Sequence, residues 1–123
     1  MNKKYEISIW KDTYSASEGR WYEEKLMVIG SDTMTSQSRA REPKLVSNIN
    51  GTNTFTFTMY YSYINNETGE YVKNPFTPFL VNERKIKVYW SGARDNESKW
   101  YDLLVKNIKE DSQNHTFTYT CED

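Results

Sequence analysis

The feature that most constrains the fold of this chain is an alternation of apolar and polar residues that recurs in several short segments. The clearest case is "TFTFTMYYSYI", Thr54 to Ile64, where Thr and Ser separate a series of apolar and aromatic residues. Successive side chains of a β-strand point to opposite faces, so a period of two predicts strands with one buried face. The segments predicted as strands are residues 5–10, 21–30, 55–63, 86–90, 100–108 and 117–121.

Helical periodicity is nearly absent. The one candidate is "NPFTPFLVNER", where Asn74 is placed to cap a short helix with Pro75 at its first position. The segment "NNETGE" predicts a hairpin turn in which Gly69 supplies a positive φ. The sequence therefore predicts an all-β fold: an antiparallel β-barrel or sandwich of about six to eight strands with at most one short helix.

The 123 residues predict a single β domain, residues 1–123. Sixteen basic and seventeen acidic residues leave a formal charge of −1, so no overall positive field is available to hold a nucleic acid. No segment has the run of about 20 apolar residues that a membrane-spanning helix needs. We therefore expect neither a nucleic acid nor a membrane as a partner.

No pattern of catalytic or metal-binding residues is found. His115 and Cys121 are the only residues of their types, and six positions along one strand would separate them by about 20 Å, too far for a catalytic pair. Adjacent acids such as Glu23 and Glu24 would point to opposite faces of a strand. No phosphate-binding glycine run and no metal-ligand spacing occurs. We expect no enzymatic activity, no metal and no cofactor.

Basic residues mark the longest segment without clear periodicity, Gly30 to Gly51. It carries Arg39, Arg41 and Lys44 among small polar residues and few large apolar ones. Loops of this length are usually functional or disordered. We therefore predict that Gly30 to Gly51 is an assembly loop, with the three basic residues as candidate contacts to a neighbouring subunit.

Two tryptophans flank the second long loop, Ser91 to Lys99. Trp90 and Trp100 are candidates either for sugar-stacking platforms or for a cross-strand aromatic pair that closes a hairpin. We favour the hairpin pair. Arg84, Lys85 and Lys87 form a further basic cluster at the start of a predicted strand, where a solvated edge or subunit contact is favoured over a nucleic acid platform.

Three segments together resemble the N-terminal part of phage tail-tip or baseplate hub proteins, the tail-associated family of long-tailed phages. They are "NPFTPFLVNERKIKVYW", "KWYDLLVKNIKEDSQNHTFTYTCED" and "IGSDTMTSQSRAREPKLVSNINGT". The resemblance follows the order of strands and turns and covers most of the chain. It departs at residues 91–99, where such hubs have a tighter turn.

This resemblance implies a structural virion protein that adapts the tail tube to the tip, as the first barrel of a larger hub protein. It also implies other tail and baseplate subunits as partners, a homo-oligomer with a trimer favoured, synthesis in the host cytoplasm and residence in the virion tail. Two alternatives stay open: a stand-alone carbohydrate-binding β-sandwich, suggested by the many aromatic residues, and a distal-tail-like ring protein. The mass of the assembled particle distinguishes a trimer from a hexamer.

Overall fold

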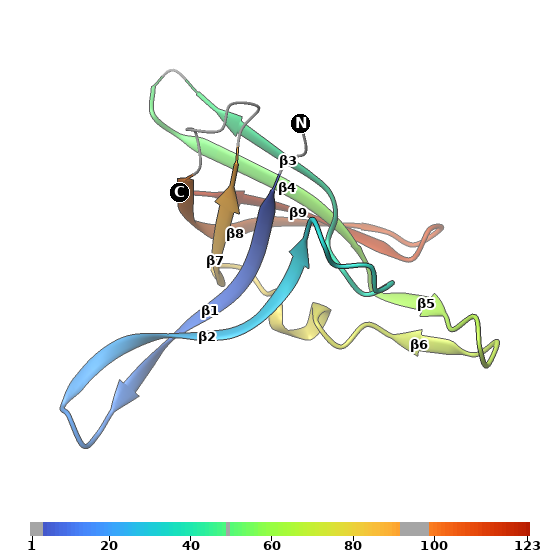
Figure 1. Ribbon diagram of the computed structural model, residues 1–123, viewed down its shortest axis with the longest axis horizontal. Coiled ribbons are helices and arrows are strands. Elements are labelled where there is room, and N and C mark those ends of the chain that lie inside the picture. Colours follow the sequence, from blue (N-terminus) through green and yellow to red (C-terminus); the bar gives the residue numbers. More distant parts are fainter. Residues whose placement is uncertain (1–3, 49, 92–98) are drawn as a thin grey trace.

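The chain folds into an all-β domain, as the alternation predicts (Figure 1). The structure is a computed structural model that describes residues 4–48, 50–91 and 99–123. Within these residues a seven-stranded antiparallel sheet makes up most of the fold, and a two-stranded sheet lies beside it. The strands are β1 (Tyr5–Ser15), β2 (Arg20–Ser31), β3 (Arg41–Ser47), β4 (Asn53–Tyr60), β5 (Ser62–Ile64), β6 (Tyr71–Lys73), β7 (Lys85–Trp90), β8 (Lys99–Asp111) and β9 (Thr116–Glu122).

The large sheet curls so that its two edge strands meet at one point. Its strand order is β2-β1-β7-β8-β9-β4-β3, so β2 and β3 are the edges. The backbone N–H of Ala40, just before β3, donates a hydrogen bond to the carbonyl of Ile29 in β2 at 2.7 Å. Gly30 permits this approach, because a Cβ there would lie 2.9 Å from the Cβ of Ala40. The curled sheet thus encloses a single core.

The core is built by the inward face of each strand, largely as the alternation predicts. Phe55, Phe57 and Met59 of β4 are fully buried, and the rings of Phe57 and Tyr119 stack with centroids 5.1 Å apart. Within the other predicted strands, the fully buried residues include Ile7, Ile9, Ile86, Val88, Val105 and Cys121. Because every contributing strand presents alternate residues to the same interior, one hydrophobic cluster holds the sheet together.

Strand β1 departs from strict alternation, because the polar Ser8 is fully buried between two buried isoleucines. The pairing of β1 with β2 shifts in register between Ile7 and Ser8 and again between Ile9 and Trp10. The Ser8 hydroxyl donates to the carbonyl of Lys87 at 3.2 Å and accepts from Trp10 Nε1 at 2.8 Å. These bonds satisfy the buried hydroxyl.

Beyond residue 10, β1 and β2 continue as a two-stranded arm that projects from the sheet (Figure 1). Strand β7 pairs with β1 only over Tyr5–Trp10, so among the described residues the outer parts of β1 and β2 pair only with each other. Tyr14 lies opposite Trp21 near the tip, with ring centroids 5.3 Å apart and 51% and 68% of their surfaces exposed. Of β1, the alternation predicted only residues 5–10, because the outer part is mostly polar and has no buried face.

The predicted turn at residues 65–70 is confirmed, and it joins β5 to β6. Gly69 has a φ of 72°, and its N–H donates to the carbonyl of Asn65 at 2.7 Å. The predicted helix is limited to one 3₁₀ turn, η1 (Thr77–Phe79). The aromatic segment predicted as a single strand breaks at Tyr61, where it divides into β4 and β5. In the part of the chain that the structure describes, no helix is long and apolar enough to cross a membrane.

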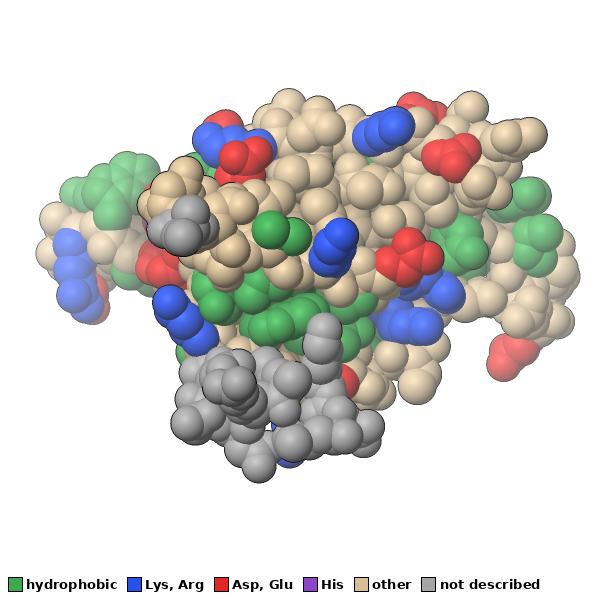
Figure 2. Space-filling model, turned by 90° about the horizontal axis from the view of Figure 1, so that it is seen from above, with side chains coloured by type: hydrophobic (Ala, Val, Ile, Leu, Met, Phe, Trp, Pro, Cys, Tyr) green, Lys and Arg blue, Asp and Glu red, His purple; other side chains and the backbone are tan. Residues whose placement is uncertain are grey.

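Charged side chains on the face seen in Figure 2 are dispersed rather than gathered by sign. On the face shown in Figure 2, lysines and arginines alternate with acidic side chains, and hydrophobic side chains lie between them near the middle. Interspersed charges of both signs give no continuous positive surface on this face.

Candidate functional site

The two residues with the most reactive side chains lie apart and in different environments. Cys121 is fully buried in the core, and this burial raises the pKa of its thiol to about 12. His115 lies in the β8–β9 turn, with its Nδ1 3.1 Å from the Ser62 hydroxyl. Over residues 4–48, 50–91 and 99–123, no cluster of three or more His, Cys, Asp or Glu side chains is arranged to hold a metal ion.

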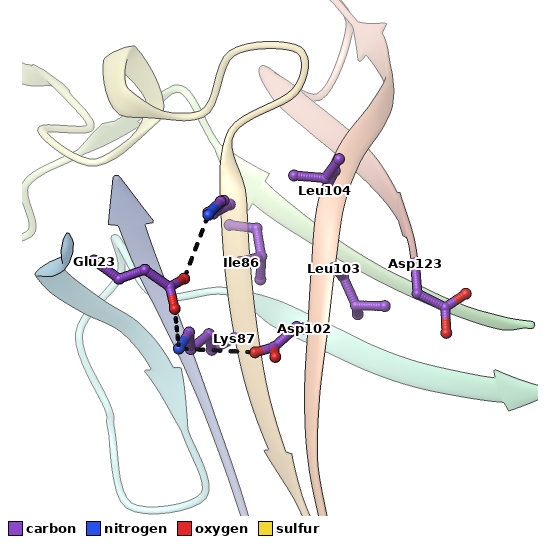
Figure 3. Close-up of a pocket in the computed structure, with 8 residues that line it drawn as sticks. Glu23, Ile86, Lys87, Asp102, Leu103, Leu104 and Asp123 are labelled. Atoms are coloured by element: carbon purple, nitrogen blue, oxygen red, sulfur yellow. Dashed lines mark hydrogen bonds and ion pairs between the residues drawn. The ribbon is translucent and has the colours of Figure 1, made fainter. Parts of the chain in front are cut away.

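Lysines and carboxylates alternate across the outer face of the sheet at the root of the arm (Figure 3). Glu23 of β2 lies between Lys85 and Lys87 of β7, at 3.5 and 3.2 Å, and Lys87 also reaches Asp102 of β8 at 3.9 Å. Lys85 donates a 2.8 Å hydrogen bond to Asp12 of β1, which is the main cause of its raised pKa. Of these side chains, Glu23, Lys85, Lys87 and Asp102 border a hollow of about 340 Å³.

The charges around this hollow pair with one another. The lysines of the basic cluster predicted at the start of β7 therefore form ion pairs within the domain. Lys85 and Lys87 face carboxylates on three other strands, and Arg84 Nε donates to the carbonyl of Phe79 at 2.9 Å. Exposed ion pairs of this kind contribute less than about 1 kcal/mol each. We interpret the array as a brace between the arm and the sheet.

The predicted assembly loop is wrong as a loop, because Arg41–Ser47 forms strand β3 and pairs with β4. Ala40 is fully buried and Leu45 packs against the core, so the segment has more anchors in its own domain than its composition suggested. Pro43 is compatible with a strand here because β3 is an edge and its register shifts between Arg41 and Lys44.

The three basic residues predicted as contacts do not share one environment. Arg39 turns back on its own loop, where Nη1 donates to the carbonyls of Thr35 and Ser36 at 3.2 and 2.9 Å. Lys44 is exposed on β3. The Arg41 guanidinium lies over the ring of Tyr60, 4.9 Å from its centroid. Of the three, Arg41 lines a hollow of the described surface.

The two tryptophans predicted as a cross-strand pair point to opposite faces, so that prediction is wrong. Trp90 lies opposite Lys99, and Trp100 lies opposite Tyr89. Trp90 is 9% exposed and packs edge-on against Phe55 at 5.6 Å. Trp100 is 52% exposed and contacts the ring of Tyr89 at 5.4 Å. The predicted loop between them lies mostly outside the described residues, at 92–98.

A second hollow, of about 340 Å³, lies between the end of the large sheet and the β5–β6 hairpin. We call it the tyrosine groove. Its lining consists of Gln37, Arg41, Tyr60, Ser62, Tyr63, Ile64, Asn66, Tyr71, Asn114 and His115. The lining combines three tyrosines with polar and basic side chains, and small-ligand sites also use a few polar groups to orient what they bind.

One wall of the tyrosine groove is a stack of His115 on Tyr71, with centroids 5.5 Å apart and an angle of 24° between the rings. His115 reaches this position with a φ of 58°, in the left-handed region. The turn before it is fixed by Asp111, whose carboxylate accepts from the backbone N–H groups of Gln113 and Asn114 and from the Asn114 amide. These hydrogen bonds lower the pKa of Asp111.

Asn74, which is 1% exposed, is hydrogen-bonded to Tyr60, one of the residues that line the tyrosine groove. Its Nδ2 donates to the carbonyls of Ser38 and Tyr60 at 3.0 and 2.7 Å, and its Oδ1 accepts from the N–H of Phe76 at 2.8 Å. One side chain thus joins the segment before β3, the end of β4 and the segment after β6. The sequence pattern predicted Asn74 only as a helix cap and gave no indication of the groove.

No protein-family model, curated protein or solved structure matches this chain. The geometry of the described surfaces and the resemblance seen in the sequence are therefore the grounds for its function.

Proposed function

We propose that this domain is a structural component of a phage tail tip or baseplate hub that adapts the tail tube to the tip. Its partners are other tail and baseplate subunits and further copies of itself, with a trimer favoured. It acts without catalysis, is made in the host cytoplasm and resides in the virion tail. The resemblance supplies this context, and the projecting β1–β2 arm is the observation that supports an assembly role.

The arm suits a contact with another protein because the aromatic residues near its tip do not pack into the core of this domain. Tyr14 and Trp21 cover each other only edge-on and stay more than half exposed, and Tyr22 on the other face is 44% exposed. Tyrosine and tryptophan are enriched in the buried centres of protein interfaces. The Arg20–Glu18 ion pair at 2.7 Å lies beside them, as a polar rim would.

The arm is also held in a defined direction. At its root, Asp12 and Glu23 pair with lysines of β7, and Lys87 lies over the ring of Trp10 at 4.3 Å. A contact surface that is fixed before binding loses less conformational entropy when a partner arrives. This favours an arm that docks rather than one that folds on binding.

Two alternatives remain as proposals of lower rank. A distal-tail-like ring protein would use the same arm in a hexamer. A carbohydrate-binding domain is favoured by one specific observation, the tyrosine groove, which an assembly role alone does not require.

The mass of the purified full chain and its incorporation into particles test the assembly proposal. We expect a species of three times 14.6 kDa, and we expect the double variant Tyr14→Ser, Trp21→Ser to remain folded but monomeric and to be absent from tails. Trp100→Ser, which removes an exposed aromatic residue from another strand, is the control. A sixfold mass would favour the ring protein. Normal incorporation of the arm variant would refute the role of the arm.

A further inference from the structure

We infer that the tyrosine groove binds a sugar residue that carries an acidic group, with Arg41 as the partner of the acid and Tyr71 as the stacking platform. Nothing in the assembly role requires such a site, and the inference does not depend on that role.

Arg41 is the central residue of this site, because no carboxylate among the described residues pairs with its charge. Its Nε is buried and has no hydrogen-bond partner in the part of the chain that the structure describes, and the guanidinium lies over the Tyr60 ring. No ion pair to Arg41 is present among the described residues. A buried donor without a partner is rare in folded proteins, and such a donor often binds an ion or a water molecule. The planar guanidinium suits the two oxygens of a carboxylate or phosphate.

The backbone directs Arg41 into the groove at some conformational cost. The register of β3 against β4 shifts directly after Arg41, and Glu42 has a φ of 53°. Such bulges redirect neighbouring side chains and are frequent beside functional sites. His115, on the opposite wall, is a second non-glycine residue with a positive φ. Non-glycine residues with a positive φ are frequent at binding sites, and here one lines the groove and one directly follows Arg41.

Tyr71 provides a platform for the ring of a sugar. One face of its ring rests on His115, and 63% of the residue is exposed. The C–H face of a sugar is weakly apolar and packs on aromatic rings, whereas its hydroxyl groups need hydrogen-bond partners. Gln37, Asn66 and Asn114 place amide groups around the same hollow. Because Asp111 already accepts from the Asn114 Nδ2, the side-chain oxygen of Asn114 is the part that can accept from a hydroxyl.

The space and the charge suit one or two sugar residues rather than a polymer of many charges. A neighbouring hollow of about 400 Å³ shares Ser62, Tyr71 and His115 with the groove and adds Lys73. The Tyr71–His115 stack therefore has one cation on each side. Two cations are far fewer than the roughly 6–10 phosphate contacts of a typical nucleic-acid site.

Titration of the full chain with matched saccharides, followed by NMR, tests the inference. The acidic probes are galacturonic acid trisaccharide, sialyllactose and glucose 6-phosphate, and the neutral counterparts are galactose trisaccharide, lactose and glucose. We expect at least one acidic probe to bind with a Kd of about 0.1–1 mM and to shift the signals of Arg41 Nε–Hε, Tyr71 and His115. Its neutral counterpart and inorganic phosphate should bind at least about tenfold more weakly.

Two variants assign the roles of the residues. Arg41→Gln should weaken the best acidic probe about tenfold or more and abolish the preference over its neutral counterpart. Tyr71→Ala should weaken the acidic and neutral probes alike; because the side chain is mostly exposed, this variant should fold even if Arg41→Gln does not. Lys44→Gln, which removes the same charge from the exposed side of β3, is the matched control and should bind as the original chain does.

Several results would overturn the inference. These are the absence of saturable binding by all three acidic probes, equal binding of neutral counterparts, phosphate binding as tight as that of the sugars, or equal losses in Lys44→Gln and Arg41→Gln. None of these results depends on the oligomeric state. Loss of assembly in the arm variant and loss of sugar binding in the groove variants are therefore separate outcomes.

Discussion

Replacing Asn74 by Ala should destabilise the domain more than any other single change of a polar side chain that we propose. The substitution removes three hydrogen bonds and leaves the carbonyls of Ser38 and Tyr60 and the N–H of Phe76 without that partner. At about 1 kcal/mol for each bond, with an added penalty for partners left unsatisfied, the loss is about 3–5 kcal/mol. An unfolding entropy of about 2.1 cal/mol/K per residue converts this into a fall in Tm of about 10–20 °C.

Thermal and urea unfolding followed by circular dichroism measure this loss. The urea midpoint should fall while the slope stays constant, because the surface exposed on unfolding is unchanged. Asn82→Ala, an exposed asparagine in the turn before β7, is the control and should lie within about 0.5 kcal/mol of the original chain. A loss below about 1 kcal/mol for Asn74→Ala would mean that water replaces the lost bonds and that Asn74 does not hold the groove together.

Three further predictions concern the contact between Gly30 and Ala40, the buried thiol of Cys121 and the ion pairs at the root of the arm. Gly30→Ala should cost about 1–3 kcal/mol because its Cβ would meet that of Ala40, and adding Ala40→Gly should restore part of the loss; equal instability of both variants would refute the clash. Burial raises the pKa of Cys121 to about 12, so the unfolded thiol, with an ordinary pKa of 9.0, releases its proton first. The contribution of this thiol to stability is therefore complete below about pH 9 and falls as the pH rises towards 12, by up to about 1.4 kcal/mol per pH unit; Cys121→Ala should flatten the urea-midpoint profile there. Glu23→Gln removes two exposed ion pairs and should cost less than about 1 kcal/mol, with the difference vanishing in high salt; a loss of several kcal/mol would show that the brace is essential.

Strong alternation was a reliable guide to the fold. Phe55, Phe57 and Met59 proved fully buried because a half-buried strand must sort its side chains by face, and this requirement is written directly in the sequence. The same logic located the inward faces of β7, β8 and β9. Where the chain has no buried face, as in the outer arm, alternation carries no information, and residues 11–15 of β1 were missed.

Strand β3 was missed for a different physical reason. An edge strand with a bulge needs fewer apolar residues, and Pro43 normally argues against a strand. Its pairing depends on β4, which lies beyond a separate turn in the sequence. Local composition therefore predicted a free loop where long-range pairing makes a strand.

The tryptophan prediction failed through register. Trp90 and Trp100 flank the same loop, but Trp100 lies opposite Tyr89, so the two side chains point to opposite faces. A shift of one residue in the pairing register turns every side chain of a strand to the opposite face, and the loop residues alone do not determine the register. The tyrosine groove was equally hidden, because its walls come from four separate segments. Of the residues that line the groove, only Arg41 was predicted from the sequence as a candidate contact.

The position of β9 within the sheet has a consequence for the order of folding. This strand is formed by Thr116–Glu122, near the C-terminal end of the sequence, yet it lies between β8 and β4. Strand β1, at the other end, pairs with β7 across some eighty residues of sequence, as in the pair Ile7 and Val88. Contacts between such distant segments make folding slow. Apart from the bond between Ala40 and Ile29, β3 and β4 join the rest of the sheet through β9, so we expect the apolar face of β4 to be covered late in folding.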